Sequence, residues 1–204
     1  MNLSKFLNPL ILASASPRRK ALLKKAGFKF IVDPSNYDEE KAPSLPPRQL
    51  AKYLSTQKAK EVAFRHPKAI ILAADTLVFC CGQVLGKPKN KKEAQQMLRL
   101  LSGSTHQVIT AFTILFPSQK KQITKSVVTK IVFRKFSDQE INYYIKTKKP
   151  FDKAGAYAIQ EQGDQFVVKI IGDYDNVVGL PVKEIEPILR KIDASSSANP
   201  HLSS

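Results

Sequence analysis

Cysteine is scarce in this chain of 204 residues: there are only two, Cys80 and Cys81, and they are adjacent. Neighbouring residues of a strand point to opposite faces, so we expect no disulfide bond between them. With no other cysteine, a disulfide framework and a Cys/His metal site are both excluded. This usage is typical of a reducing compartment, and we expect a cytoplasmic protein.

Histidine is equally sparse, with three residues in the chain. His66 and His201 are isolated, and no Ser-His-Asp or Cys-His order emerges around them. His106 stands between strand residues, and we interpret it as structural. No apolar run approaches the roughly 20 residues of a membrane span. The N-terminal residues indicate a lead-in and first strand, not a signal peptide, so we expect no membrane partner.

Acidic residues number 17 against 33 lysines and arginines, which gives a net charge of +16 and favours anionic partners. Many of the basic residues lie between Lys120 and Lys153, with aromatic residues among them. Nucleic acid is therefore one candidate partner. The stretch carries no recognised nucleic-acid motif, and scattered lysines usually form a solvated surface. We expect nucleic acid not to be the primary partner.

The most informative stretch runs from Leu10 to Gly27. A short apolar run predicts a buried strand, and Ser16 and Pro17 are typical of the N-cap and first residue of a helix that Gly27 ends. The turn between them gathers backbone N–H groups, two hydroxyls and two guanidinium groups, a set that favours a phosphate. The alternative is an ordinary capped helix with a solvated basic first turn. The stretch alone leaves both interpretations open.

Two acidic features stand out in so basic a chain. The proline-rich loop 33–47 contains Asp38, Glu39 and Glu40, which indicate either a divalent metal site or a plain solvated loop. Further on, Asp75 and Thr76 interrupt a buried strand that begins at Ala69 and resumes at Leu77. An aspartate at the carboxyl end of a strand is typical of ligand sites in α/β proteins, although a turn aspartate is the alternative.

Strands and helices alternate along the chain, with hairpins between some of them. This order predicts an α/β fold with a mixed sheet, one domain over 1–192 and a polar, disordered tail over 193–204. The expected helices are 17–26, 48–65, 91–102, one opened by a capping box at Ser137, and one from Pro181 to about Ile192. The expected strands are 10–13, 28–32, 69–74, 77–81, 105–116, 123–133, 166–171 and a short strand that ends the loop 152–160, with a turn at 172–176.

Six ordered motifs carry a family resemblance that covers Leu10 to about Ile188. They are Ser14 to Arg19 (SASPRR), Ala73 to Thr76 (AADT), Gly86 to Pro88 (GKP), Leu101 to Val108 (LSGSTHQV), Asp152 to Gln160 (DKAGAYAIQ) and Asn176 to Pro181 (NVVGLP). Together they resemble the Maf family of nucleoside triphosphate pyrophosphatases. Glu161, Asp173 and Asp175 depart from the usual pattern, at positions that are expected to affect only the rim of the cleft.

The resemblance implies a two-lobed α/β fold like that of the inosine-triphosphate pyrophosphatases, with a nucleotide cleft between the lobes. It also implies a divalent metal and hydrolysis of a nucleoside triphosphate to the monophosphate and pyrophosphate. The resemblance implies that Asp75 is the catalytic carboxylate. Arg18, Thr76 and Gln160 match the branch of the family that acts on dTTP and UTP.

The chemistry suggests a role for each side chain. We expect Asp75 to act as general base toward the attacking water, and Glu39, with Asp38, to join Asp75 in binding Mg²⁺ or Mn²⁺. A second group is expected to neutralise the phosphates: Ser14, Ser16, Arg19, Lys58 and Lys87. For Lys58 the alternative is an ordinary exposed helix lysine.

Gln160 suits uracil and thymine because its amide carries both a donor and an acceptor. Its NH₂ group can donate to O4 while its carbonyl accepts from N3–H, whereas cytosine presents the opposite pattern. Since the amide can rotate, Arg18 and Thr76 are expected to fix its orientation.

The predicted activity is hydrolysis of dTTP, UTP and modified pyrimidine nucleotides, which would limit misincorporation of the modified ones. The alternative is a non-catalytic inhibitor of septum formation that binds a division partner or nucleic acid. The sequence leaves the oligomeric state open, with a homodimer among the candidates.

Overall fold

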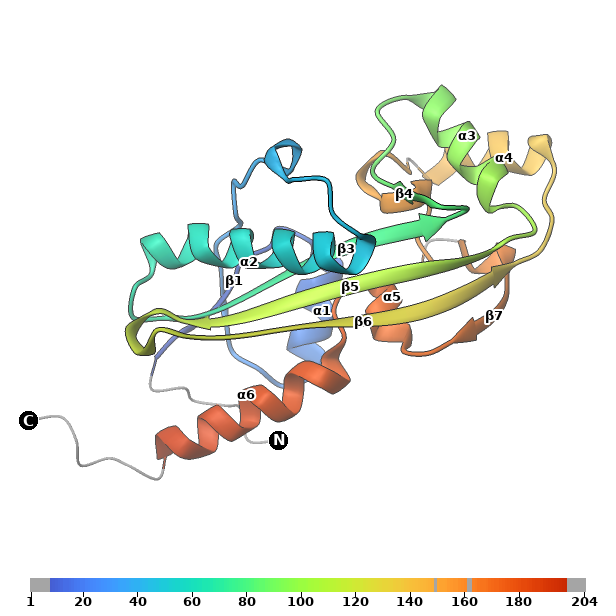
Figure 1. The fold of residues 1–204 in the computed structure, drawn as a ribbon. Helices are drawn as coiled ribbons and strands as arrows, with labels where there is room; N and C mark the ends of the chain where they lie inside the picture. The colour runs from blue at the N-terminus through green and yellow to red at the C-terminus, as the bar shows by residue number, and fades with distance from the viewer. Residues whose placement is uncertain (1–7, 149, 161–162, 198–204) are drawn as a thin grey trace, which may run out of the picture.

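The structure is a computed structural model, and it describes residues 8–148, 150–160 and 163–197. Its described residues form a seven-stranded mixed sheet with helices on both faces (Figure 1). The strands are β1 (Leu10–Leu12), β2 (Ile31–Val32), β3 (Ile70–Cys80), β4 (Gln83–Leu85), β5 (Thr105–Phe116), β6 (Lys121–Phe133) and β7 (Val167–Ile171). The helices are α1 (Pro17–Lys25), α2 (Pro47–Arg65), α3 (Lys91–Leu101), α4 (Asp138–Lys148), α5 (Tyr174–Val178) and α6 (Val182–Ser197).

The sheet has the order β2-β1-β3-β5-β6-β7, with β4 paired to β3. β1 is parallel to β2 and β3, whereas β3, β5, β6 and β7 form antiparallel pairs. The predicted mixed α/β fold is therefore confirmed. Two lobes share this sheet: one carries α1, α2 and α6, the other carries α3 and α4, and the long strands run through both (Figure 1).

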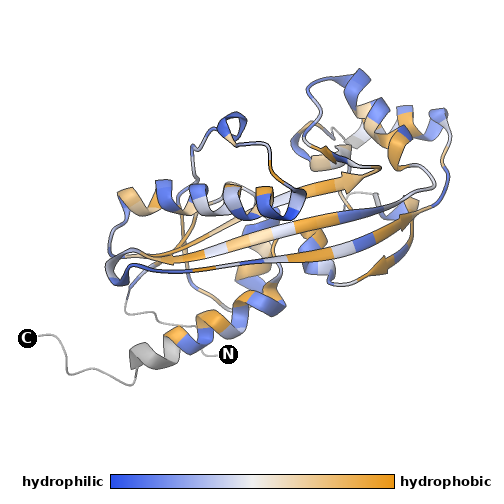
Figure 2. Cartoon of the chain, viewed as in Figure 1, coloured by the Kyte–Doolittle hydropathy of each residue, from blue (hydrophilic) through white to orange (hydrophobic). Residues whose placement is uncertain are grey.

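Side-chain alternation along the strands explains how both faces are covered. Ile11 and Ile71 pack against α2, while their neighbours Leu12 and Leu72 belong to the core that includes α1 and α6. Hydrophobic residues are accordingly concentrated along the central strands, while hydrophilic residues colour much of the outer helix surface (Figure 2).

Most expected elements are present, and local capping explains their bounds. Ser16 caps α1 by accepting a hydrogen bond from the N–H of Arg19 at 3.4 Å. At α4 the N–H of Glu140 donates to Ser137 Oγ at 3.3 Å, and the N–H of Ser137 donates to the Glu140 carboxylate at 2.8 Å. The predicted capping box is confirmed.

Several expectations were wrong. β3 runs without interruption through Asp75 because β5 pairs with it along this stretch, with Asp75 opposite Ala111. The segment 150–160 contains two 3₁₀ turns, Pro150–Asp152 and Ala154–Ala156, in place of a strand. The expected turn at 172–176 leads into the short helix α5, which Asp173 caps through the N–H of Asp175. The strand expected over 28–32 is limited to β2.

The last helix is longer than expected. α6 ends at Ser197, so it includes the first residues of the predicted tail. The rest of that tail lies outside the described residues, and the division at residue 192 stays a prediction.

The adjacent cysteines do not point apart. Cys81 lies in the β3–β4 turn with φ +49°, so its Sγ lies 3.4 Å from that of Cys80, although both thiols are free.

Candidate active site

A single cavity of about 460 Å³ is lined by ten of the side chains that the sequence analysis proposed for the site, and Asp38 is the one that does not line it. Ser14, Ser16, Arg18 and Arg19 come from the start of α1 and the turn before it, and Lys58 comes from α2. Asp75 and Thr76 come from β3, Glu39 from the 3₁₀ turn Glu39–Lys41, Lys87 from a loop and Gln160 from the segment 150–160. The sequence prediction that these residues form one site is consistent with this arrangement.

The cavity lies where β1 leaves the sheet. β1 pairs with β3 only as far as Leu72, and β4 pairs with β3 only from Val78 onward. Between these two partners, one edge of β3 faces the cavity, and Asp75 and Thr76 lie on that stretch. Because successive residues point to opposite faces, the edge presents a carboxylate on the α2 side and a hydroxyl on the α1 side.

Asp75 is buried, with 4% of its surface exposed. Lys58 Nζ donates to Asp75 Oδ1 at 2.5 Å and to Glu39 Oε1 at 2.8 Å. The side chain of Lys58 is only 13% exposed, so the alternative of an ordinary surface lysine is wrong. An ion pair in this setting compensates the cost of burying a carboxylate.

The second oxygen of Asp75 is buried and accepts no hydrogen bond from the described residues. A buried, unpaired carboxylate oxygen is rare, and it calls for a water, an ion or a ligand. Asp75 and Glu39 together supply the oxygen donors that Mg²⁺ and Mn²⁺ prefer, with substrate phosphates to complete the shell. The donor set therefore fits a divalent cation that is shared with the substrate.

Charge explains how Glu39 stays ionised near the cavity. Burial alone would raise the pKa of Glu39, but attraction and hydrogen bonding from Lys58, with smaller contributions from Lys87 and Arg19, hold it below its ordinary value. Asp38 has a different role, because it caps the turn through the N–H of Glu40 and pairs with Lys41 at 3.7 Å. The two acidic neighbours therefore separate into one residue that lines the cavity and one that shapes the loop.

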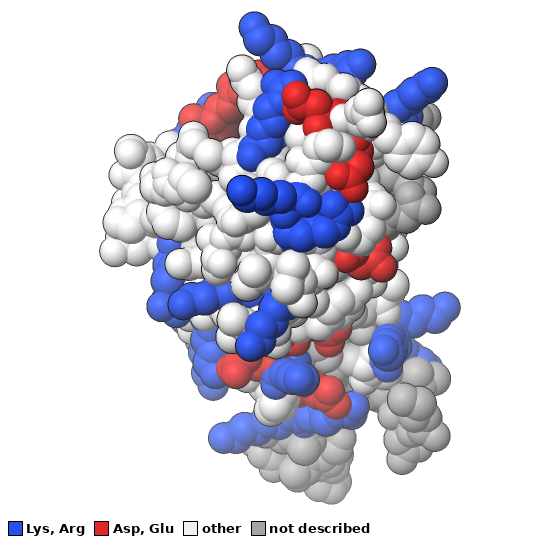
Figure 3. Space-filling model, turned by 90° about the vertical axis from the view of Figure 1, so that its right-hand side faces the viewer, with Lys and Arg blue, Asp and Glu red and all other residues white. Residues whose placement is uncertain are grey.

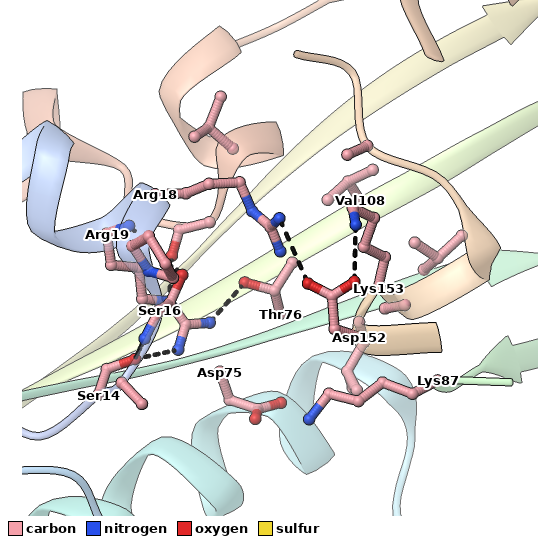
Figure 4. A pocket seen from close by; sticks show the side chains of 18 of the residues that line it. Ser14, Ser16, Arg18, Arg19, Asp75, Thr76, Lys87, Val108, Asp152 and Lys153 are labelled. Carbon is pink, nitrogen blue, oxygen red and sulfur yellow. Dashed lines mark hydrogen bonds and ion pairs between the residues drawn. The ribbon is translucent and has the colours of Figure 1, made fainter. Parts of the chain in front are cut away.

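Arg19 is held by its neighbours more firmly than the sequence indicated. Its guanidinium donates to Gly179 O at 2.8 Å, to Ser14 Oγ at 3.2 Å and to Thr76 Oγ1 at 3.0 Å. Burial lowers the pKa of Arg19, and the charge of Asp75 opposes that shift. Arg19 thus joins the first turn of α1 to β3 and to the end of α5, with Thr76 in the same network (Figure 4).

Behind Thr76 lies a buried polar network that the sequence reasoning missed. Thr76 shares a hydrogen bond with Thr110 at 3.0 Å, and the Thr110 hydroxyl donates to Asn176 O at 2.8 Å. The Asn176 amide donates to Val108 O at 3.0 Å and to Thr129 Oγ1 at 2.9 Å. Asn176 belongs to the last of the six motifs. Its role follows from its full burial, which the structure shows and the sequence does not.

The segment 150–160 covers the cavity from the second lobe. Gly155 has φ +70°, and a Cβ there would lie 3.1 Å from the side chain of Val78, so the segment packs closely on β3. His106 and the Tyr157 hydroxyl share a hydrogen bond of 2.8 Å, which anchors the segment to β5. His106 is therefore structural, as expected, and Gln160 at the end of the segment is exposed to the cavity.

Arg18 reaches across the cavity to this segment. Its guanidinium lies 3.8 Å from the Asp152 carboxylate, which also accepts a hydrogen bond of 2.6 Å from Lys153 (Figure 4). The sequence reasoning included Asp152 in a motif but gave it no role.

The chain matches the family model described as Maf-like protein over residues 9–192. It belongs to the Maf family. Similar proteins include a dTTP/UTP pyrophosphatase of Alkaliphilus oremlandii, 48% identical over 90% of this chain and 96% of the relative. A dTTP/UTP pyrophosphatase of Bacillus pumilus is 46% identical, again over 90% of this chain and 96% of the relative.

A solved structure of the Ham1 protein of Staphylococcus aureus shares the fold. It superposes with a TM-score of 0.54 at 12% identity and covers 90% of this chain and 99% of its own.

Proposed function

We propose that this protein is a nucleoside triphosphate pyrophosphatase that hydrolyses dTTP and UTP to the monophosphate and pyrophosphate. The observation that carries the proposal is the cavity itself. It holds a buried carboxylate, one oxygen of which accepts no hydrogen bond from the described residues, and five basic side chains line the same cavity. Relatives that are 46% and 48% identical bear the name dTTP/UTP pyrophosphatase, which supports the same substrates here.

The proposed chemistry uses Asp75 as the general base. Lys58 holds one oxygen of this carboxylate, which leaves the other to accept a proton from the water that attacks the α-phosphorus. Burial keeps this oxygen from bulk solvent, and the contact with Lys58 fixes its orientation. The proton therefore passes directly to Asp75.

The basic side chains stabilise charge that develops on the leaving pyrophosphate. Lys58 and Lys87 line the cavity near Asp75, while Ser14, Ser16 and Arg19 line it at the start of α1. Three hydrogen bonds hold the Arg19 guanidinium in place. It therefore stabilises the phosphates by its fixed positive charge, without a rearrangement of its side chain.

We propose that a divalent cation, Mg²⁺ or Mn²⁺, binds to Glu39 and Asp75 together with the substrate. When bound, it would polarise phosphate oxygens and screen their charge. In its absence the ammonium of Lys58 balances the charge of the same two carboxylates.

Base recognition is assigned to Gln160 and Arg18, which line the same cavity. Thr76 is also assigned to substrate specificity, and its hydroxyl is held by Arg19 and Thr110. We also keep cytoplasmic location as a proposal. Among the described helices, none is both long and apolar enough to cross a membrane.

The distribution of basic residues on the surface does not support binding of nucleic acid. Lysines and arginines are spread over the face drawn in Figure 3 and alternate with acidic side chains. That nucleic acid is not the primary partner stays a prediction, as do the oligomeric state and any role in cell division.

The test is release of pyrophosphate from dTTP, UTP, CTP and GTP with Mg²⁺ or Mn²⁺. We expect monophosphate and pyrophosphate as the products, with dTTP and UTP favoured. Release of inorganic phosphate with a diphosphate product, or no turnover with any of the four, would contradict the proposal. A non-catalytic binding protein would give the second result.

A further inference from the structure

The Asp152 carboxylate has no role in the chemistry described so far, although it lines the same cavity. It belongs to the 3₁₀ turn Pro150–Asp152 of the second lobe, and its side chain is 65% exposed. Figure 4 shows it directed toward Arg18 of α1 and Lys153 of its own segment.

The charge state of Asp152 is fixed by these neighbours. Burial would raise its pKa, but the hydrogen bond and charge of Lys153, with a smaller contribution from Arg18, hold the pKa below its ordinary value. The group is therefore an ionised carboxylate at neutral pH, and an ionised carboxylate only accepts hydrogen bonds. Among the described residues, Lys153, Arg18 and the backbone of Asp152 itself contact the carboxylate, and these contacts leave part of its roughly four lone-pair sites for a ligand.

The other acceptors of the cavity are largely committed. Ser14 Oγ accepts from Arg19 and from the N–H of Ser16, and Thr76 accepts from Arg19. Glu39 and Asp75 belong to the metal and the reacting water under the proposed function. The acceptors that remain for the nucleoside include the Gln160 carbonyl and Asp152.

The donors of the substrate can be matched to these acceptors. Thymine and uracil have one ring donor, N3–H, which is assigned to Gln160. The other donor that dTTP and UTP share is the 3′-hydroxyl of the sugar. The sugar joins the base to the phosphates, and Asp152 comes from the segment that carries Gln160 while it faces α1, where the phosphate-binding residues begin.

We propose that Asp152 binds the 3′-hydroxyl of the nucleotide sugar and that the Arg18 and Lys153 contacts hold its carboxylate in place for this. The inference rests on the proposed function for its choice of ligand. It explains how one cavity accepts a deoxyribonucleotide and a ribonucleotide, because the hydroxyl that it reads is present in both.

The test compares ligands that differ only in this hydroxyl. Binding of dTMP and of 2′,3′-dideoxythymidine monophosphate is measured by calorimetry with the wild type, Asp152→Ala and Asp138→Ala. Asp138 is a matched control, because its side chain is 64% exposed and pairs with Arg99 at 2.8 Å, away from the cavity. Steady-state rates with dTTP and its 3′-deoxy counterpart, ddTTP, complete the set.

We expect the wild type to bind dTMP more tightly than the dideoxy ligand by about 10- to 150-fold, the scale of a hydrogen bond to a charged group. In Asp152→Ala this ratio should fall to near one, because the hydroxyl and the carboxylate act as a pair. Asp138→Ala should keep the wild-type ratio. The kcat/KM ratio for dTTP and ddTTP should follow the same pattern.

Three results would overturn the inference. They are a wild-type ratio near one, a ratio that Asp152→Ala leaves unchanged, and an equal weakening of both ligands, which would mean that Asp152 only bridges the lobes. Failure of the proposed function looks different: the wild type would release no pyrophosphate from dTTP, while the dTMP ratio would still decide the sugar contact.

Discussion

Lys58 Nζ lies 2.5 Å from Asp75 Oδ1, and this contact links α2 to the centre of β3. One ammonium thereby orients the carboxylate that we propose as the base. The same ammonium also binds Glu39. If Lys58, Asp75 or Glu39 loses its charge, the other two therefore lose part of their charge compensation.

Asp75→Asn tests the base directly, because it keeps the size of the side chain and its contact with Lys58 while removing the charge. We expect pyrophosphate release to fall by at least roughly a hundredfold, the scale of a lost general base. Circular dichroism should remain close to wild type, which would show that the variant folds. Near-normal turnover by the pure variant would refute the assignment.

Glu39→Gln tests the metal site. We expect a higher Mn²⁺ concentration for half-maximal rate, and weaker Mn²⁺ binding by electron paramagnetic resonance in the presence of nucleotide, because a carboxylate ligand is lost. Glu40→Gln is the matched control, since Glu40 is adjacent and exposed but does not line the cavity. Identical metal titrations for the two variants would show that Glu39 is not a ligand.

Gln160→Ala tests recognition of the base. The phosphate-binding side chains act on every triphosphate alike, so discrimination must come from the base edge. We expect the preference for UTP over CTP in kcat/KM to shrink by about 1–3 kcal/mol, the cost of unpaired polar groups, while hydrolysis persists. Gln165→Ala, an exposed residue outside the cavity, should leave the ranking unchanged. An unaltered ranking in Gln160→Ala would refute the role.

His106→Gln tests the buried imidazole. Burial lowers the pKa of His106 from 6.5 to about 4. The folded state therefore binds fewer protons than the unfolded state between these values, so the stabilisation is present above pH 6.5 and is lost as the pH falls toward 4. We expect the wild type to lose on the order of 3 kcal/mol more than the variant over this range in urea unfolding.

His66→Gln is the control for that experiment, because His66 is partly exposed and pairs with Asp33 at 2.7 Å. This variant should retain the extra loss of stability at low pH. Equal pH profiles for the wild type and His106→Gln would show that the imidazole does not couple folding to protons.

The sequence predicted the residues of the site better than their geometry. The small hydroxyl turn before α1 and the aspartate after an apolar run are local signals, and both lie in the cavity wall. The sequence nevertheless predicted Asp75 at the end of a strand, because a charged residue after an apolar run is typical of a strand end. Only the pairing with β5 and the ammonium of Lys58 make a buried aspartate acceptable in mid-strand.

Non-local contacts account for the other errors. Periodicity could not distinguish a strand from 3₁₀ turns over 150–160, because the segment packs so closely on β3 that a Cβ at Gly155 would crowd Val78, which is distant in the sequence. Likewise, the role of Asn176 depends on Val108 and Thr129, which are distant in the sequence. Local propensity contains no information about such partners.

The continuous β5 and β6 strands have a consequence for how this molecule can move and come apart. β5 contacts α2 through Thr113 and Ser55, and it contacts the segment over the cavity through His106 and Tyr157. Any closure of the cleft must therefore twist an intact β-ribbon, which allows only small amplitudes. Limited proteolysis should release neither lobe as a stable fragment, and calorimetry should record one melting transition.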